Sequence, residues 1–212
     1  MVALGISLLV IFGLITALAI IVSPNILDVP ITRALQSLDN DLFGALMIAV
    51  SAPGFAPWSF IFPLAIIAVV ALCRRFVEAG FLALATLASG ADNLVKELVH
   101  RARPSGTLVH VVQNLPSYSF PSGHVTEYTL VFGFTFYLAF TLLKHGIIRT
   151  FILVFCGAMI VLVGPSRVWM GQHWASDALG GYTLGFGLLL IVIWAYRGWQ
   201  ERRVKEAPLA AR

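Results

Sequence analysis

Residues 121–143 read PSGHVTEYTLVFGFTFYLAFTLL, in which a proline, a serine, a glycine and a histidine stand at the start of an almost unbroken apolar run. A helix of about 20 predominantly apolar residues crosses the hydrocarbon core of a bilayer. The stretch therefore predicts a membrane span over residues 122–143, with its small and ionisable residues at one end.

The rest of the chain has the composition of a membrane protein. Of its 212 residues, 59% are hydrophobic and 11% are charged, whereas about 25% of the residues in a soluble domain are charged. Five further apolar runs predict spans over about 3–22, 58–73, 77–99, 148–164 and 175–197. The sequence thus predicts an all-α polytopic membrane bundle of six transmembrane helices, organised as a single domain over residues 1–212. Its net charge of +4 includes no basic block interleaved with aromatics, so a nucleic-acid partner is not expected.

Residues 24–57 do not fit a full span. The stretch 31–50 has helical periodicity but too little continuous apolar length, and SAPGFAP at 51–57 interrupts it. We expect an interfacial or half-inserted helical segment between the first two spans.

Basic residues set the expected orientation, because cytoplasmic loops carry an excess of Lys and Arg. With six spans, both termini share a side with the loops near 74–76 and 144–149. Nine of the fourteen Lys and Arg residues fall on that side: Arg74, Arg75, Lys144, Arg149, Arg197, Arg202, Arg203, Lys205 and Arg212. We therefore expect cytoplasmic termini, with the loops at 100–121 and 165–175 on the extracytoplasmic face.

The first of three polar groups on that face is KELVHRARP, residues 96–104. Lys96 and Arg103 are seven residues apart, so two turns of helix would place them on one face. Pro104 ends any helix here and favours an extended backbone at Arg103. Snorkelling of long basic side chains at the membrane edge is the alternative interpretation.

The second group is PSGH, residues 121–124. A helix that begins here offers free backbone N–H groups and a partial positive charge to an anion. Gly123 allows the backbone close to a ligand, Ser122 adds a hydroxyl donor, and His124 can supply a proton near neutral pH. An ordinary serine cap beside an interfacial histidine is the alternative.

The third group is SRVWMGQHWASD, residues 166–177. His173 and Asp177 are four residues apart, so on a helix the carboxylate can reach and orient the imidazole. Arg167 adds a planar guanidinium suited to bidentate phosphate binding. A surface His–Asp pair is the alternative, but an unpartnered carboxylate at the start of an apolar span is costly.

Together the three groups combine three cations, a helix N-terminus and two histidines. Cations and N–H donors favour an oxyanion ligand, and two histidines favour phosphoryl transfer with one nucleophile and one general acid. The sequence has no HExxH and no Asp/Glu cluster, so we expect no metal site and no cofactor.

The groups also match known motifs in order: K-x6-R-P over 96–104, PSGH over 121–124 and S-R-x5-H-x3-D over 166–177. In these motifs and its expected spans the chain resembles the type 2 phosphatidic acid phosphatase family. The wider superfamily includes vanadium-dependent haloperoxidases and glucose-6-phosphatase. The resemblance implies a six-helix membrane fold and a phosphatase that needs no metal.

The resemblance also implies roles for the matched residues. His173 would be the nucleophile that forms a phosphohistidine, Asp177 would orient and charge it, and His124 would protonate the leaving oxygen. The phosphate oxygens would be bound by five residues: Lys96, Arg103, Ser122, Gly123 and Arg167.

The expected activity is hydrolysis of a lipid phosphomonoester or diphosphate, such as phosphatidate or phosphatidylglycerol phosphate, whose tail stays among the membrane lipids. The expected location is a bacterial cytoplasmic membrane, with the active site on the extracytoplasmic side. An undecaprenyl diphosphate phosphatase is a second candidate. A vanadate-dependent haloperoxidase and a non-enzymatic membrane transporter, which would also use charges within six spans, are alternatives from other classes.

Overall fold

The computed structural model describes residues 1–24, 26–38 and 40–206. Within these ranges the chain forms helices and no strand. The elements are α1 (Val2–Ile21), α2 (Asp28–Gln36), α3 (Asp41–Ser51), the 3-10 turn η1 (Ala52–Gly54), α4 (Trp58–Leu72), α5 (Phe76–Ser89), α6 (Ala91–Val99), α7 (Gly123–Leu142), α8 (Ile147–Trp169) and α9 (Ala175–Glu206). The predicted all-α fold is confirmed.

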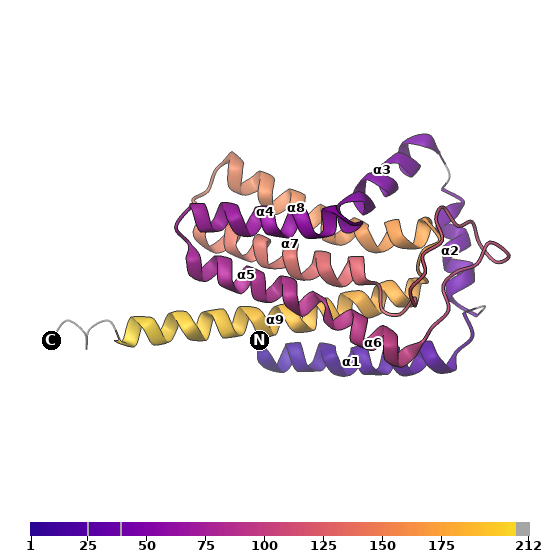
Figure 1. Cartoon of the computed structure of the whole chain (residues 1–212), viewed down its shortest axis with the longest axis horizontal. Coiled ribbons are helices and arrows are strands. Elements are labelled where there is room, and N and C mark those ends of the chain that lie inside the picture. The colour runs from indigo at the N-terminus through magenta and orange to yellow at the C-terminus, as the bar shows by residue number, and fades with distance from the viewer. Residues whose placement is uncertain (25, 39, 207–212) are drawn as a thin grey trace.

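Helix α7 forms the centre of the bundle. Figure 1 shows it between α4 and α8 on one side and α5 and α9 on the other, and it packs directly against α5, α8 and α9. In its most apolar stretch 61% of residues are buried, against 11% for α1, which packs on α9 at the edge of the bundle. The helix that begins at the PSGH group is therefore the one that the others surround.

In the part of the chain that the structure describes, four helices are long and apolar enough to cross a membrane: α1, α7, α8 and residues Ala175–Lys205 of α9. A fifth candidate is the pair Asp41–Gly54 and Trp58–Leu72, which is bent by 68° at its break. The predicted span 58–73 corresponds to α4, and the predicted segment 24–57 forms α2, α3 and η1, with α3 packed on α8. Its interfacial position stays a prediction.

The prediction of one unbroken helix over 77–99 was wrong. The chain forms α5 and α6 with a break at Gly90. Glycine weakens a helix, and the preceding Ser89 donates its hydroxyl to the Thr86 carbonyl at 2.7 Å, which competes with the helical bonds. The polar α6 is thereby a separate element, which carries Lys96 beside the start of α7.

The loops lie at two opposite ends of the bundle, in the two groups that the sequence predicts. Figure 1 shows the N-terminus of α1, the α4–α5 turn and the α7–α8 turn toward one end of the bundle. At the other end lie α2 and the loops that follow α6 and α8. Which end faces the cytoplasm stays a prediction, and Arg212 lies outside the described residues.

Small residues allow α9 to approach α7 closely. A Cβ at Gly181 would lie 2.8 Å from the Ser122 carbonyl oxygen, and a Cβ at Gly185 would lie 2.7 Å from Cβ of Thr129. These distances are too short for any side chain, so the two glycines set the separation of the helices that carry Ser122 and Asp177.

We predict that Gly185→Leu lowers the melting temperature of the detergent-solubilised protein. Overpacking of this kind costs about 1–3 kcal/mol, because the added side chain must displace Thr129 or separate α7 from α9. The matched control is Gly157→Leu in α8, where an added Cβ meets no heavy atom within 4 Å. Equal melting temperatures for the two variants would contradict the close packing.

Candidate active site

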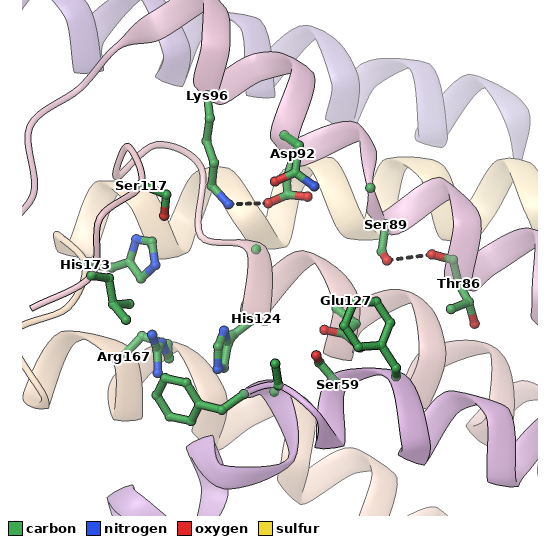
Figure 2. A pocket seen from close by; sticks show the side chains of 18 of the residues that line it. Ser59, Thr86, Ser89, Asp92, Lys96, Ser117, His124, Glu127, Arg167 and His173 are labelled. Atoms are coloured by element: carbon green, nitrogen blue, oxygen red, sulfur yellow. Dashed lines mark hydrogen bonds and ion pairs between the residues drawn. The ribbon is translucent and has the colours of Figure 1, made fainter. Parts of the chain in front are cut away.

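A cavity of about 520 Å³ lies beside the N-terminal end of α7. Figure 2 shows Lys96, His124, Arg167 and His173 around it, carried by α6, α7, α8 and the loop before α9. Six of the eight predicted site residues line this cavity: Lys96, Arg103, Gly123, His124, Arg167 and His173. Ser122 and Asp177 are not among the lining residues, and both are fully buried.

The start of α7 is built for close approach. Ser122 is its N-cap, in extended conformation, and its backbone N–H donates to the Asp177 carbonyl at 3.1 Å. A Cβ at Gly123 would lie 2.5 Å from Oδ2 of Asp92 and 3.1 Å from Nζ of Lys96, so a larger residue here would displace these side chains of α6. Lys96 in turn is ion-paired with Asp92, four residues earlier on the same helix.

Arg167 is fully buried and incompletely paired. Its Nη1 donates to the Ser51 hydroxyl at 3.2 Å, and its guanidinium lies 4.8 Å from the centre of the Phe55 ring. Within the described ranges, its Nε and Nη2 have no hydrogen-bond partner and no carboxylate forms an ion pair with it. A buried charge without a partner is costly, so these donors favour an anion in the cavity.

Arg103 determines the tautomer of His173. Its Nη1 lies 3.1 Å from Nε2 of His173, and the same guanidinium donates to the carbonyls of Gln172 and Ser117, at 2.6 Å each. A guanidinium has no acceptor atom, so Nε2 must accept and the ring proton must lie on Nδ1. Nε2 of His173 therefore carries the lone pair of the ring, and it lies beside Arg103, which lines the cavity.

Burial and nearby positive charges keep the imidazole of His173 neutral. Burial lowers the pKa of His173 well below its usual value of 6.5, and the charges of Arg103, Arg167 and Lys96 lower it further, against a smaller opposing effect of the Ser119 carbonyl. A neutral imidazole whose Nε2 carries the lone pair is the form that attacks an electrophile.

Asp177 lies beside His173 as the spacing predicts, but the contact is longer than a hydrogen bond. Oδ2 of Asp177 is 3.6 Å from Nδ1 of His173. The carboxylate instead accepts from the Ser119 hydroxyl and from the backbone N–H of Trp174, the latter at 2.8 Å. The negative charge of Asp177 still lies beside the edge of the His173 ring that carries the Nδ1 proton.

The cation that compensates the charge of Asp177 is Arg101, which was not predicted from the sequence. Arg101 donates to Asp177 at 2.5 Å and to Asp28 of α2 at 2.7 Å, and all three are buried. Asp28 also accepts from the backbone N–H and the hydroxyl of Ser176, at 2.8 Å each. Arg101 stands two residues before Arg103 in the first polar group, but nothing in the sequence pairs it with an aspartate 73 positions away.

His124 lies at the middle of the cavity wall in Figure 2, between the Arg167–His173 side and a second part of the cavity near Ser59, Thr86 and Glu127. Its Nε2 is buried and has no hydrogen-bond partner in the described part of the chain. The Ser122 hydroxyl is likewise buried without a partner there. The unpaired nitrogen of His124 thus belongs to a residue that lines the same cavity as Arg167 with its unpaired donors.

Comparison with known proteins is consistent with this arrangement. The family model described as PAP2 superfamily matches residues 77–201, a range that contains all eight predicted site residues. Among curated proteins, the chain is 35% identical over 125 residues to phosphatidylglycerophosphatase B of Bacillus subtilis (strain 168), covering 55% of this chain and 56% of that protein. It is 31% identical over 130 residues to lipid A 1-phosphatase of Rhizobium etli, covering 57% of this chain and 52% of that protein. The chain thus aligns with about half the length of these two relatives.

A solved structure extends the likeness to almost the whole fold. The crystal structure of a transmembrane PAP2-type phosphatidylglycerolphosphate phosphatase from Bacillus subtilis superposes with a TM-score of 0.70 at 26% identity. The superposition covers 93% of this chain and 96% of the other. Since the family model covers more than half of the 212 residues and includes every motif around the cavity, the chain belongs to the PAP2 superfamily.

Proposed function

We propose that the protein is an integral-membrane phosphatase that hydrolyses a lipid phosphate through a phosphohistidine. The observation that carries this proposal is the buried Arg167, whose unpaired donors lie in one cavity with Lys96, Arg103 and the two histidines. A tetrahedral phosphate supplies the acceptors that these donors lack.

In the proposed first step, Nε2 of His173 attacks phosphorus and the ester oxygen leaves. The N–P bond forms as the P–O bond breaks, and His124, protonated in the presence of the phosphate dianion, donates a proton to the departing oxygen. Lys96, Arg103 and Arg167 stabilise the charge on the equatorial oxygens. Asp177 stabilises the positive charge that the His173 ring acquires.

In the second step, a water molecule attacks the phosphohistidine. His124, now neutral, takes a proton from that water, the N–P bond breaks, and inorganic phosphate leaves with the neutral His173 restored. Ser122 and the backbone N–H of Gly123, at the N-terminus of α7, bind phosphate oxygens in both steps.

We propose a phosphomonoester of a glycerolipid as the substrate, with phosphatidylglycerol phosphate first, because two of the similar proteins are named for it. The lipid tail stays in the bilayer, since the site lies at the helix ends. A six-span topology with cytoplasmic termini and an extracytoplasmic site, in a bacterial cytoplasmic membrane, is supported by the distribution of basic residues.

We predict that purified protein releases phosphate from phosphatidylglycerol phosphate in the presence of EDTA, and that His173→Ala reduces release to the uncatalysed background. The second imidazole of the cavity, His124, has the separate role of proton donor in the proposed mechanism. The matched control is His145→Ala, because His145 lies in the α7–α8 turn and is bonded to Arg149. Loss of activity with EDTA would contradict the metal-free mechanism, and an active His173→Ala would contradict the phosphohistidine.

We predict that the imidazole of His173 titrates below pH 6.5. Its pKa is lowered, so the neutral ring persists as the pH falls through 6.5, where an ordinary histidine gains its proton. Nitrogen-15 NMR of histidine-labelled protein measures this directly, with the His173 signal assigned by its loss in His173→Gln. A His173 midpoint at or above 6.5 would contradict the proposed neutral nucleophile.

We predict that phosphatidylglycerol phosphate and phosphatidate are better substrates than undecaprenyl diphosphate. The ranking follows two of the similar proteins, which are named for phosphatidylglycerol phosphate and not for a polyprenyl diphosphate. The measurement is kcat/KM of the parent protein on the three lipids.

A parent protein that prefers undecaprenyl diphosphate would reverse the substrate assignment and favour the lipid-carrier phosphatase.

A further inference from the structure

The segment Ser51–Phe55 contacts the active site although it lies outside the range that matches the family model, residues 77–201. It consists of the last residue of α3, the turn η1 and Phe55, and the sequence marks it only as a break between helices. Two of its residues, Gly54 and Phe55, line the cavity.

Phe55 contacts two of the proposed reacting groups at once. Its ring centre lies 4.8 Å from Cζ of Arg167 in a cation–π contact. It also lies 4.8 Å from the ring centre of His124, with an interplanar angle of 73°. One aromatic ring thus contacts both the Arg167 guanidinium and the His124 imidazole.

Gly54 limits the space available to His124. A Cβ at this position would lie 2.7 Å from Nε2 and 2.8 Å from Cγ of the imidazole. Both distances are shorter than any van der Waals contact, so any other residue at position 54 would displace the ring. The absence of a side chain at Gly54 is therefore what admits His124 to its present place.

The segment is held rigidly against the helices that carry these groups. Tyr128 of α7 donates its hydroxyl to the Val50 carbonyl at 2.9 Å. The Ser51 hydroxyl lies 2.7 Å from that of Ser166 and accepts from Arg167 at 3.2 Å. The Ser166 hydroxyl also donates to the Met47 carbonyl at 2.6 Å. The segment is therefore tied to α7 next to His124 and to α8 next to Arg167.

We propose that Gly54 and Phe55 are positioning residues that place the proton donor His124 and the phosphate ligand Arg167 relative to each other. This inference rests on the proposed phosphatase function. It adds to the site a segment that none of the three motifs contains.

The first test separates proton donation from phosphate binding. Gly54→Ala should reduce the rate of phosphohistidine formation from dioctanoyl phosphatidate, measured as single-turnover release of the alcohol, by about 100-fold, the lower range for loss of a general acid, because its alkoxide must be protonated to leave. With para-nitrophenyl phosphate, whose phenolate leaves without a proton, the same variant should lose less than about tenfold in the first-turnover release of nitrophenolate, a step that precedes the attack of water. The control is Gly157→Ala in α8, which adds the same methyl group where no heavy atom lies within 4 Å.

The second test concerns Arg167 and does not depend on tolerance of a larger residue at position 54. Phe55→Leu removes the ring without adding atoms, and it should raise the inhibition constant of inorganic phosphate against dioctanoyl phosphatidate by about 3- to 30-fold. Phe55→Tyr keeps the ring and should restore the parent value. Phe151→Leu is the matched control, since Phe151 is an exposed aromatic residue of α8.

The outcomes are distinguishable from failure of the proposed function. An inactive parent protein would overturn the phosphatase itself. With an active parent, equal losses of Gly54→Ala on the alkyl and aryl substrates would overturn the placement of His124. An unchanged phosphate inhibition constant in Phe55→Leu would overturn the placement of Arg167.

Discussion

The structure depends on the pairing of buried Arg101 with two aspartates, Asp28 and Asp177. The guanidinium joins α2, the loop after α6 and the start of α9, three elements that are far apart in the chain. Removal of one partner from such a buried pair is far more costly than the pair is stabilising, because it leaves a charge without compensation. The bonds of Asp28 to Ser176 extend the same network to the residue beside Asp177. The network that holds Asp177 beside His173 therefore includes α2, an element outside the matched family range.

The two buried arginines differ in a way that accounts for the site. Arg101 has its charge compensated within the protein, while Arg167 has a hydroxyl and an aromatic ring but no carboxylate partner in the described residues. Low-dielectric surroundings strengthen the attraction of an unpaired cation for an anion. One arginine thus stabilises the fold, and the other is available to a ligand. A third arginine, Arg103, bonds both to Nε2 of His173 and to the loop at Ser117, so it contacts the cavity and the fold alike.

The helices pack closely around the end of the bundle that carries the cavity and its polar residues. The cavity requires α6 to approach α7 at Gly123, and α9 to approach α7 at Gly181 and Gly185. Where the chain carries polar groups, the helices are short: α2, α6 and η1 together surround the site, while α1, α7, α8 and α9 are long. A membrane protein confines irregular backbone to such places because unpaired backbone groups are costly in lipid. The break at Gly90 and the bend between α3 and α4 are both of this kind.

The sequence by itself determined the all-helical membrane fold, the three motifs and six of the residues that line the cavity. It could do so because apolar periodicity and short-range spacing are local properties, and because Lys96, His124, Arg167 and His173 lie within such motifs. Only the tertiary structure decided the partner of Asp177, the break of the third predicted span and the role of residues 24–57. Asp28, Ser51 and Phe55 meet the site from more than 60 positions away in the chain. No pattern along the chain records such contacts, since they arise from how the helices pack.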